Sequence, residues 1–142
     1  MTIDKLIANT EALDFNVVIK ESVDETVQEL TSYQQQQLYS GLRSDGQTIY
    51  PSYTRLTEEI KSGKGQVTDR VTLKDTGAFY AGIQVRAGAN GVNITSTDSK
   101  TGMLEEKYGE EIFGLNADSA AKYSENELEP LAVKKIKEQI LK

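Results

Sequence analysis

A polar corner followed by an alternating run is the feature that most constrains the fold of this chain. The segment from Leu73 to Ile83 reads LKDTGAFYAGI. Within it, Asp75 can accept hydrogen bonds from backbone amides one or two residues on, and Gly77 can adopt a positive φ. We therefore expect Asp75 to Gly77 to form a corner from which a strand begins at once.

The run after this corner has the period of two that a half-buried β-strand requires. One face of the expected strand is apolar and carries Phe79, Ala81, Ile83, Val85 and Ala87. The other face carries Tyr80, Gly82, Gln84 and Arg86. We expect the first face to enter the core, and the second to lie in solvent or against a polar partner surface.

A hairpin turn is expected at Asn90-Gly91, because both residues tolerate the positive φ of a type I′ turn. A two-residue loop sets the pairs Ala89 with Val92, Ala87 with Ile94, and Val85 with Ser96. This register puts the apolar faces of both strands on the same side. The hairpin is thus expected to occupy residues 78–98.

Apolar residues recur at helical spacing through residues 15–38, which predicts one long amphipathic helix ended by Gly41. The glutamine run from Gln34 to Gln37 lies inside this helix and is expected to be a solvated patch. Residues 1–14 before it are expected to form either a separate short helix or a mobile arm.

Between this helix and the hairpin, Thr54 to Lys61 is expected to be a short helix with Leu56 and Ile60 facing inward. Residues 62–70 then contain two glycines and several cations, which predicts a flexible basic loop. This loop is either ordinary surface or a functional contact. We expect it to be poorly ordered in an isolated subunit and to become ordered against a neighbouring subunit or a channel lumen.

Two further helices are expected after the hairpin. Residues 101–108 fit a short helix closed by Gly109, in which Met103, Leu104 and Tyr108 are buried. Asn116 can cap a C-terminal helix that runs to about residue 141. Pro130 should kink or interrupt that helix.

A fresh helix start at Ser124 is the alternative for the C-terminal region, because Ser124 and Glu127 fit a capping box. With either start, the pattern predicts an α+β fold. The long N-terminal helix and the C-terminal helix pack on a small antiparallel sheet that contains the 78–98 hairpin.

The 142 residues are expected to form a single domain, 1–142, with enough chain to bury a core. The chain contains no cysteine and no histidine, which removes thiolate chemistry, disulfides and the commonest general base and metal ligand. A net charge of -6 disfavours duplex DNA as a ligand. Neither a signal peptide nor a membrane span is evident, so we expect assembly in the cytoplasm and no membrane partner.

Searches for catalytic and ligand motifs give no candidate. Adjacent acidic pairs such as Glu58-Glu59 and Glu105-Glu106 diverge on a helix and do not converge on one substrate atom. Residues 97–108 lack the carboxylates of a calcium loop, and residues 62–65 lack the frame of a phosphate-binding loop. We therefore expect no enzyme, no metal site and no cofactor.

Taken in order, the segments resemble a tailed-bacteriophage family of tail-completion and head-to-tail joining proteins, also called virion morphogenesis proteins. The sharpest element is the LxDTGxF pattern at Leu73 to Phe79. Weaker elements are the stretch DGQTIYPSYTRLT, from Asp45 to Thr57, and KYGEEIFGLN, from Lys107 to Asn116. Many members have histidine or glutamine where this chain has Lys107.

The resemblance implies a homo-oligomeric ring at the neck or tail of a virion, with a portal or adaptor and tail proteins as partners. It implies no catalytic residues and no sequence-specific nucleic acid. The alternative is an acidic, non-enzymatic inhibitor or adaptor that binds a host protein. A closed ring requires each subunit to present two different patches.

The candidate interface combines the cations of the basic loop, the polar face of the hairpin and surface tyrosines. Packing is favoured over stacking on nucleic-acid bases for these tyrosines, because few cations lie near them in the sequence. The candidate interface residues are Lys64, Arg70, Lys74, Tyr80, Gln84, Arg86, Tyr50 and Tyr53.

Overall fold

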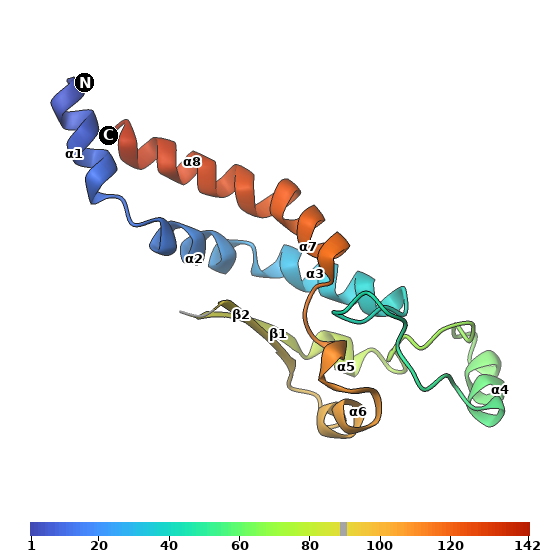
Figure 1. The fold of residues 1–142 in the computed structure, drawn as a ribbon. Coiled ribbons are helices and arrows are strands. Elements are labelled where there is room, and N and C mark those ends of the chain that lie inside the picture. Colours follow the sequence, from blue (N-terminus) through green and yellow to red (C-terminus); the bar gives the residue numbers. More distant parts are fainter. Residues whose placement is uncertain (89–90) are drawn as a thin grey trace.

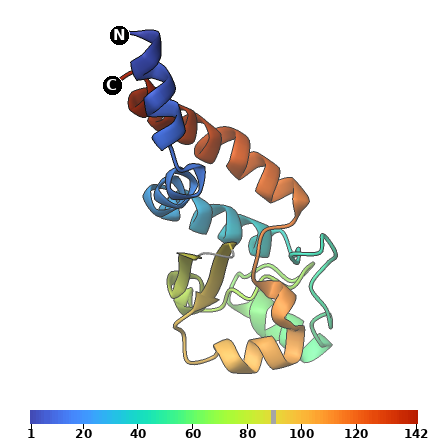
Figure 2. The same ribbon diagram turned by 60° about the vertical axis from the view of Figure 1, so that its left-hand side comes forward.

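A computed structural model describes residues 1–88 and 91–142 and has the expected α+β fold (Figure 1). In chain order the elements are α1 (Ile3–Ala12), α2 (Phe15–Glu25), α3 (Val27–Tyr39), α4 (Arg55–Gly63), α5 (Ala78–Ala81), β1 (Ile83–Gly88), β2 (Gly91–Ser96), α6 (Thr101–Tyr108), η1 (Glu110–Ile112), α7 (Ala117–Tyr123), η2 (Ser124–Leu128) and α8 (Glu129–Ile140). Both views show an elongated molecule, with α1 and the end of α8 at one pole and α4 and α6 towards the other (Figures 1 and 2).

The expected helix over residues 15–38 is two helices, because the chain leaves helical geometry at Thr26 (φ −114°, ψ 22°). The hydroxyl of Thr26 lies 2.7 Å from the hydroxyl of Tyr123, a residue of α7. This long-range hydrogen bond stabilises the break between α2 and α3. The spacing of apolar residues in the sequence gives no sign of the break. Residues 3–12 form the separate short helix that was one of the two alternatives, and Asn9 holds it to the carbonyl of Ile140 on α8.

The C-terminal region is one continuous helical rod in which η2 is a π-helical segment between α7 and α8. Asn116 caps its start as expected, by accepting a hydrogen bond from the amide of Ser119 (2.9 Å). The alternative capping box at Ser124 is wrong, because Ser124 keeps helical angles and its hydroxyl donates to Glu129 instead. The wider π turn accommodates Pro130, whose missing N–H cannot continue the regular helical ladder.

The hairpin is present, but its strand begins later than expected. Gly77 has the expected positive φ of 93°, yet the chain then forms the helical turn α5, so β1 begins only at Ile83. The amide of Ala78 donates to the hydroxyl of Thr76, so Thr76 and not Asp75 accepts the local turn bond. The alternation seen in the sequence therefore spans one helical turn and one strand.

The pairing register differs from the expected one by two residues, since Val85 pairs with Ile94 and Ala87 with Val92. A shift of two leaves every side chain on its expected face, because the side-chain period of a strand is also two. Ile83 and Val85 accordingly enter the core. Of the turn expected at Asn90-Gly91, Asn90 lies outside the described residues, as does the pairing expected for Ala89.

The hydrophobic core contains two clusters, and α3 contributes a leucine to each. One cluster gathers Leu38, Ile49, Val71, Leu73, Phe79, Tyr80, Ile83, Tyr108 and Ile112. The other gathers Val23, Leu30, Val85 and Tyr123. Helix α3 lies between the hairpin and the C-terminal rod and contributes to both clusters.

The glutamine run on α3 is not a solvated patch, because Gln34 and Gln37 are buried. Gln34 donates to the carbonyl of Ile112 (3.1 Å) and accepts from the amide of Gly114 (2.8 Å). Gln37 donates to the carbonyl of Gly114 and accepts from the amide of Asn116, both at 2.8 Å. These two side chains satisfy the backbone of residues 112–116, which has no strand partner in the described part of the chain.

Candidate functional site

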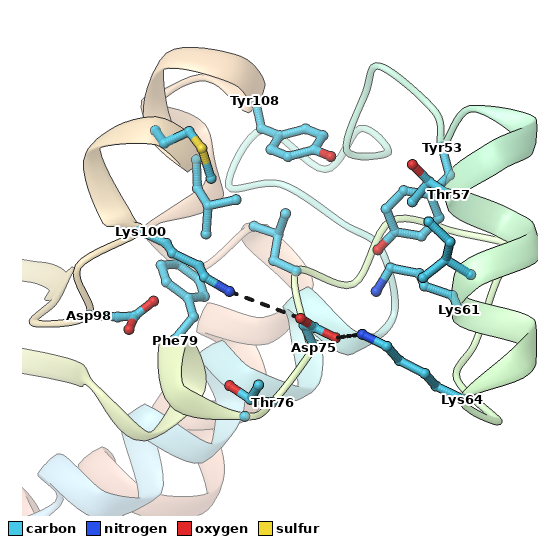
Figure 3. A pocket seen from close by; sticks show the side chains of 15 residues that line it. Tyr53, Thr57, Lys61, Lys64, Asp75, Thr76, Phe79, Asp98, Lys100 and Tyr108 are labelled. Atoms are coloured by element: carbon cyan, nitrogen blue, oxygen red, sulfur yellow. Dashed lines mark hydrogen bonds and ion pairs between the residues drawn. The ribbon is translucent and has the colours of Figure 1, made fainter.

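A cleft of about 260 Å³ opens between α4, α6 and the segment that carries the LxDTGxF pattern (Figure 3). Its floor is apolar and is formed by Leu73, Phe79, Leu104 and Tyr108. Its rim carries three lysines, Lys61 and Lys64 from α4 and its C-terminal cap, and Lys100 from the residue before α6. The cleft therefore combines an apolar bottom with a cationic edge.

Asp75 lies at the mouth of this cleft between two of the lysines (Figure 3). Its carboxylate is 3.2 Å from the ammonium of Lys64 and 4.0 Å from that of Lys100, and it accepts a hydrogen bond from Gln66. The hydrogen bond from Gln66 and the bond and charge of Lys64 lower the pKa of Asp75 below its ordinary value. Asp75 is therefore ionised at neutral pH and holds α4 and the start of α6 together across the cleft.

Replacing Asp75 by asparagine is expected to lower the free energy of unfolding at pH 7 by less than about 1 kcal/mol, because the ion pairs are solvent-exposed and screened. The folded-state pKa lies below the unfolded value, so this stabilisation exists above about pH 4 and is lost as the pH falls through the folded value. Urea unfolding of both proteins at pH 7 and at about pH 3 measures this effect. The difference in unfolding free energy between the natural chain and the Asp75→Asn variant should be smaller at the lower pH. The control is Glu106→Gln, an exposed carboxylate on α6; an equal loss there would contradict this role for Asp75.

Two tyrosines hold the backbone that forms the cleft floor. The hydroxyl of Tyr53 accepts from the amide of Thr72 (3.0 Å), and the hydroxyl of Tyr80 donates to the carbonyl of Thr72. Leu73, the next residue, has a positive φ of 58°, which is uncommon for a residue with a side chain. The tyrosine clamp stabilises this backbone conformation and so points Leu73 into the floor.

Tyr80 was expected on the outer face of a strand and is buried instead, with 8% of its surface exposed. Burial raises the pKa of its hydroxyl above the ordinary value. The expectation for Tyr80 was wrong because residues 78–81 form the helical turn α5 and not a strand. A helical turn places Phe79 and Tyr80 side by side in the core, whereas a strand would point them to opposite faces. Tyr80 therefore supports the cleft and is not an exposed contact residue.

Arg70 of the basic loop and the flanking cations Lys61 and Lys74 rest on tyrosine rings of the same chain. Arg70 lies 5.1 Å from the ring centre of Tyr39 and donates to the Tyr39 carbonyl, and Lys74 lies between the rings of Tyr39 and Tyr80. Lys61 lies 4.9 Å from the ring centre of Tyr53. Such contacts are worth about 0.5–1 kcal/mol each at exposed sites. The flexibility expected for residues 62–70 stays a prediction.

The remaining candidate residues lie apart from the cleft. Gln84 and Arg86 are exposed on the polar face of β1, as expected, and do not line the cleft. Tyr50 is exposed and stacks against Arg43 in the turn after α3. Of the eight candidate residues, Lys64 and Tyr53 line the cleft, and Lys74 and Tyr80 lie beside each other behind it. Arg70 lies on Tyr39, outside the cleft lining, and Gln84, Arg86 and Tyr50 lie elsewhere.

Three apolar side chains expected in the core lie at the surface near the cleft. Leu56 and Ile60 on α4 are 67% and 52% exposed, and Met103 on α6 is 61% exposed. The helical spacing of Leu56 and Ile60 was identified correctly, but α4 packs too loosely on the rest of the subunit to bury them. Ile60 and Met103 line the cleft together with Lys61 and Lys100, two residues that are not among the candidate interface residues.

A second apolar surface lies at the opposite pole, on α1 and α2. Helix α1 contains no buried residue, and α2 buries one side only. The exposed apolar side chains on these helices are Ile3, Ile7, Phe15, Val17 and Ile19, with exposures of 76%, 48%, 58%, 47% and 43%.

Within residues 1–88 and 91–142, no three acidic side chains gather closely enough to hold a metal ion. Across the same residues, no helix has both the length and the apolar character needed to cross a bilayer.

Comparison of the chain with protein-family models, with curated proteins and with solved structures finds no match. The basis for assigning a function is therefore the lysine-rimmed cleft, the apolar surface of α1 and α2, and the sequence pattern at the cleft floor.

Proposed function

We propose that this chain is a structural subunit of a tailed-phage virion, which assembles into a homo-oligomeric ring at the neck or tail and joins the portal or adaptor to the tail. The observation that carries the proposal is the apolar surface of α1 and α2. A subunit that works alone would leave this surface in water.

The exposed apolar side chains on α1 and α2 include pairs that share a helix face, Ile3 with Ile7 on α1 and Phe15 with Ile19 on α2. Burial of apolar area is favourable by roughly 25 cal/mol per Å². Contiguous apolar patches on soluble proteins commonly mark interaction sites. Phe15, Val17 and Ile19 follow one another within two turns of α2, although Val18 and Val23 on the same helix are already buried in the subunit.

The position in a virion is supported by the LxDTGxF resemblance at Leu73 to Phe79. In the structure this segment supplies the mouth and floor of the cleft, through Asp75, Leu73 and Phe79. The LxDTGxF segment therefore lies at a surface cleft as well as in the core. This position is consistent with a segment that contacts other proteins during assembly. The α1 part of the apolar surface lies at the opposite pole from α4 and α6, the helices that border the cleft, which suits the two different patches that a ring subunit needs (Figures 1 and 2).

Substitution of Ile7 by aspartate is expected to weaken self-assembly by at least about tenfold, because it places a charge in the apolar surface. Folding should be little affected, since Ile7 is exposed and α1 contains no buried residue. Mass photometry over a range of concentrations measures the effect. Ala8→Asp is the matched control, because it adds the same charge at the neighbouring exposed position.

Electron microscopy of particles made without this protein tests the place in the virion. Tailless heads filled with DNA are the expected product, and normal infectious particles would contradict the joining role. A chain that stays monomeric at all concentrations and binds one host protein tightly would instead support the inhibitor or adaptor alternative.

A further inference from the structure

We propose that helix α1 of one copy docks on the lysine-rimmed cleft of the next copy, with Ile3 and Ile7 entering the cleft. The contact is head-to-tail and repeats from subunit to subunit. This inference rests on the proposed function, since it names the two patches that build the ring.

The size of the cleft favours side chains of a protein partner over a free small molecule. Pockets for drug-sized ligands and cofactors usually measure about 300–1,000 Å³, and this cleft measures about 260 Å³. Its floor is apolar, and Ile60 and Met103 extend the apolar surface on either side. Such a site fits one or two aliphatic anchors projecting from a partner helix.

Helix α1 presents anchors of this kind. Ile3 and Ile7 are separated by four residues, so they lie one above the other on the same face of the helix. Both are exposed, while Leu6 and Asn9 face α8. Helix α1 thus has one side held by its own subunit and an apolar side that nothing in the same subunit covers.

The charges that flank the two surfaces are opposite in sign. Asp4 and Glu11, seven residues apart, share one side of α1 next to the Ile3–Ile7 face, and both are exposed. On the cleft, Lys64 and Lys100 both lie near the carboxylate of Asp75, at 3.2 and 4.0 Å.

Lys61 adds a third cation to the rim. Its ammonium lies by the ring of Tyr53 and donates to uncharged oxygens of Gln66 and of the Lys74 backbone. Three lysines and two carboxylates, Asp75 and Asp98, line the cleft, so it carries one positive charge in excess in a chain whose net charge is -6. Carboxylates beside the anchors of a partner helix would complement it.

The contact can form only between copies, because α1 lies at the opposite pole of the subunit from α4 and α6, which border the cleft (Figures 1 and 2). An interface between two different patches is heterologous, and repetition of it closes into a ring or extends as a filament. This is the geometry that the proposed ring requires.

A second groove competes as the receiving surface for α1. It lies between α2 and the hairpin, has a volume of about 430 Å³ and is lined by Val17, Ile19 and Val92. Its one lysine, Lys20, is already paired with Asp24 at 3.0 Å. This groove offers apolar contact without matching the charges of α1, so the cleft is the better fit.

Disulfide trapping tests the contact. The natural chain has no cysteine, so every cross-link must come from the introduced residues. A variant with Ile3→Cys and Met103→Cys is expected to form a ladder of cross-linked oligomers on mild oxidation. A variant with Ile3→Cys and Val92→Cys probes the competing groove and is expected to remain uncross-linked. The single variant Ile3→Cys controls for α1–α1 contacts, which would give dimers only.

The charge match is tested by Glu11→Lys, which is expected to weaken assembly about fivefold at low salt. A lysine near the C-terminal end of α1 is favourable for the helix, so unfolding of α1 would not explain a loss. Glu125→Lys is the matched control, because it makes the same charge change at an exposed site away from both surfaces.

The outcomes separate this inference from the proposed function. Rings that form without a cross-link between residues 3 and 103, or with one between residues 3 and 92, overturn the docking of α1 on the cleft and leave the ring proposal standing. Absence of any oligomer across the accessible concentration range overturns both. A ladder from the first variant, together with a selective effect of Glu11→Lys, supports the inference.

Discussion

Replacing Gln34 by leucine is expected to lower the free energy of unfolding by about 3 kcal/mol. Leucine fills nearly the same space but cannot hydrogen-bond. The change leaves the carbonyl of Ile112 and the amide of Gly114 without their partners. Each buried polar group that loses its partner costs about 1–3 kcal/mol, because it has no water to replace the lost bond.

Urea unfolding followed by circular dichroism measures this loss, and Gln36→Leu is the control. Gln36 belongs to the same run and the same helix but is exposed, so its replacement should change stability by no more than about 0.5 kcal/mol. Equal effects at the two positions would show that residues 112–116 do not depend on the α3 amides.

Replacing Gly82 by alanine is expected to cost about 2 kcal/mol, the second largest effect. A Cβ atom at this position would lie 2.7 Å from the hydroxyl oxygen of Ser96 and 3.0 Å from the amide nitrogen of Asp98. The φ of Gly82 is an ordinary −81°, so lack of space and not backbone strain causes the cost. Relief by rotation of Ser96 would break its hydrogen bond to the carbonyl of Phe79.

Gly102→Ala is the matched control for Gly82→Ala. Gly102 lies in α6, and a Cβ added there meets nothing within 4 Å. Alanine is favoured over glycine in a helix by about 1 kcal/mol, so this variant should be somewhat more stable than the natural chain. Thermal or urea unfolding of both variants should therefore shift in opposite directions, and a shift in the same direction would contradict the close approach at Gly82.

Local chemistry in the sequence was sufficient to predict several elements. The Asn116 cap, the end of α6 at Gly109 and the positive φ of Gly77 all depend on neighbouring residues, and all are confirmed. The two faces expected for Ile83 to Ala87 are also confirmed, because a register shift of two preserves them. The faces expected for Tyr80 and Ala81 are wrong, because both residues belong to the helical turn α5, where Tyr80 is buried and Ala81 is exposed.

Features that depend on distant partners were not predictable from the sequence. The amides of Gln34 and Gln37 read as polar in any hydropathy pattern, and their acceptors and donors lie more than seventy residues away. The break at Thr26 depends in the same way on Tyr123. Leu56 and Ile60 have a buried spacing, but spacing gives no information on whether the body provides a surface to cover them.

The candidate site was predicted in part. Lys64, Lys74 and Tyr53 were selected from local charge and aromatic content, and they lie at or beside the cleft. Lys100 was missed because it reaches the cleft only through tertiary structure, from the residue before α6. Asp75 was assigned to a local turn, whereas its partners Lys64 and Lys100 are eleven and twenty-five residues away.

The π-helical segment η2 makes the number of residues in the C-terminal rod as important as their chemistry. A regular α-helix turns by about 100° per residue, so removal of one residue from this segment would rotate all of α8 by about that angle. Ala132 would leave the core, and Lys135 would turn away from Glu21 and Glu25 on α2. Substitutions at η2 alter single contacts, whereas a one-residue deletion changes which side of α8 meets the rest of the subunit.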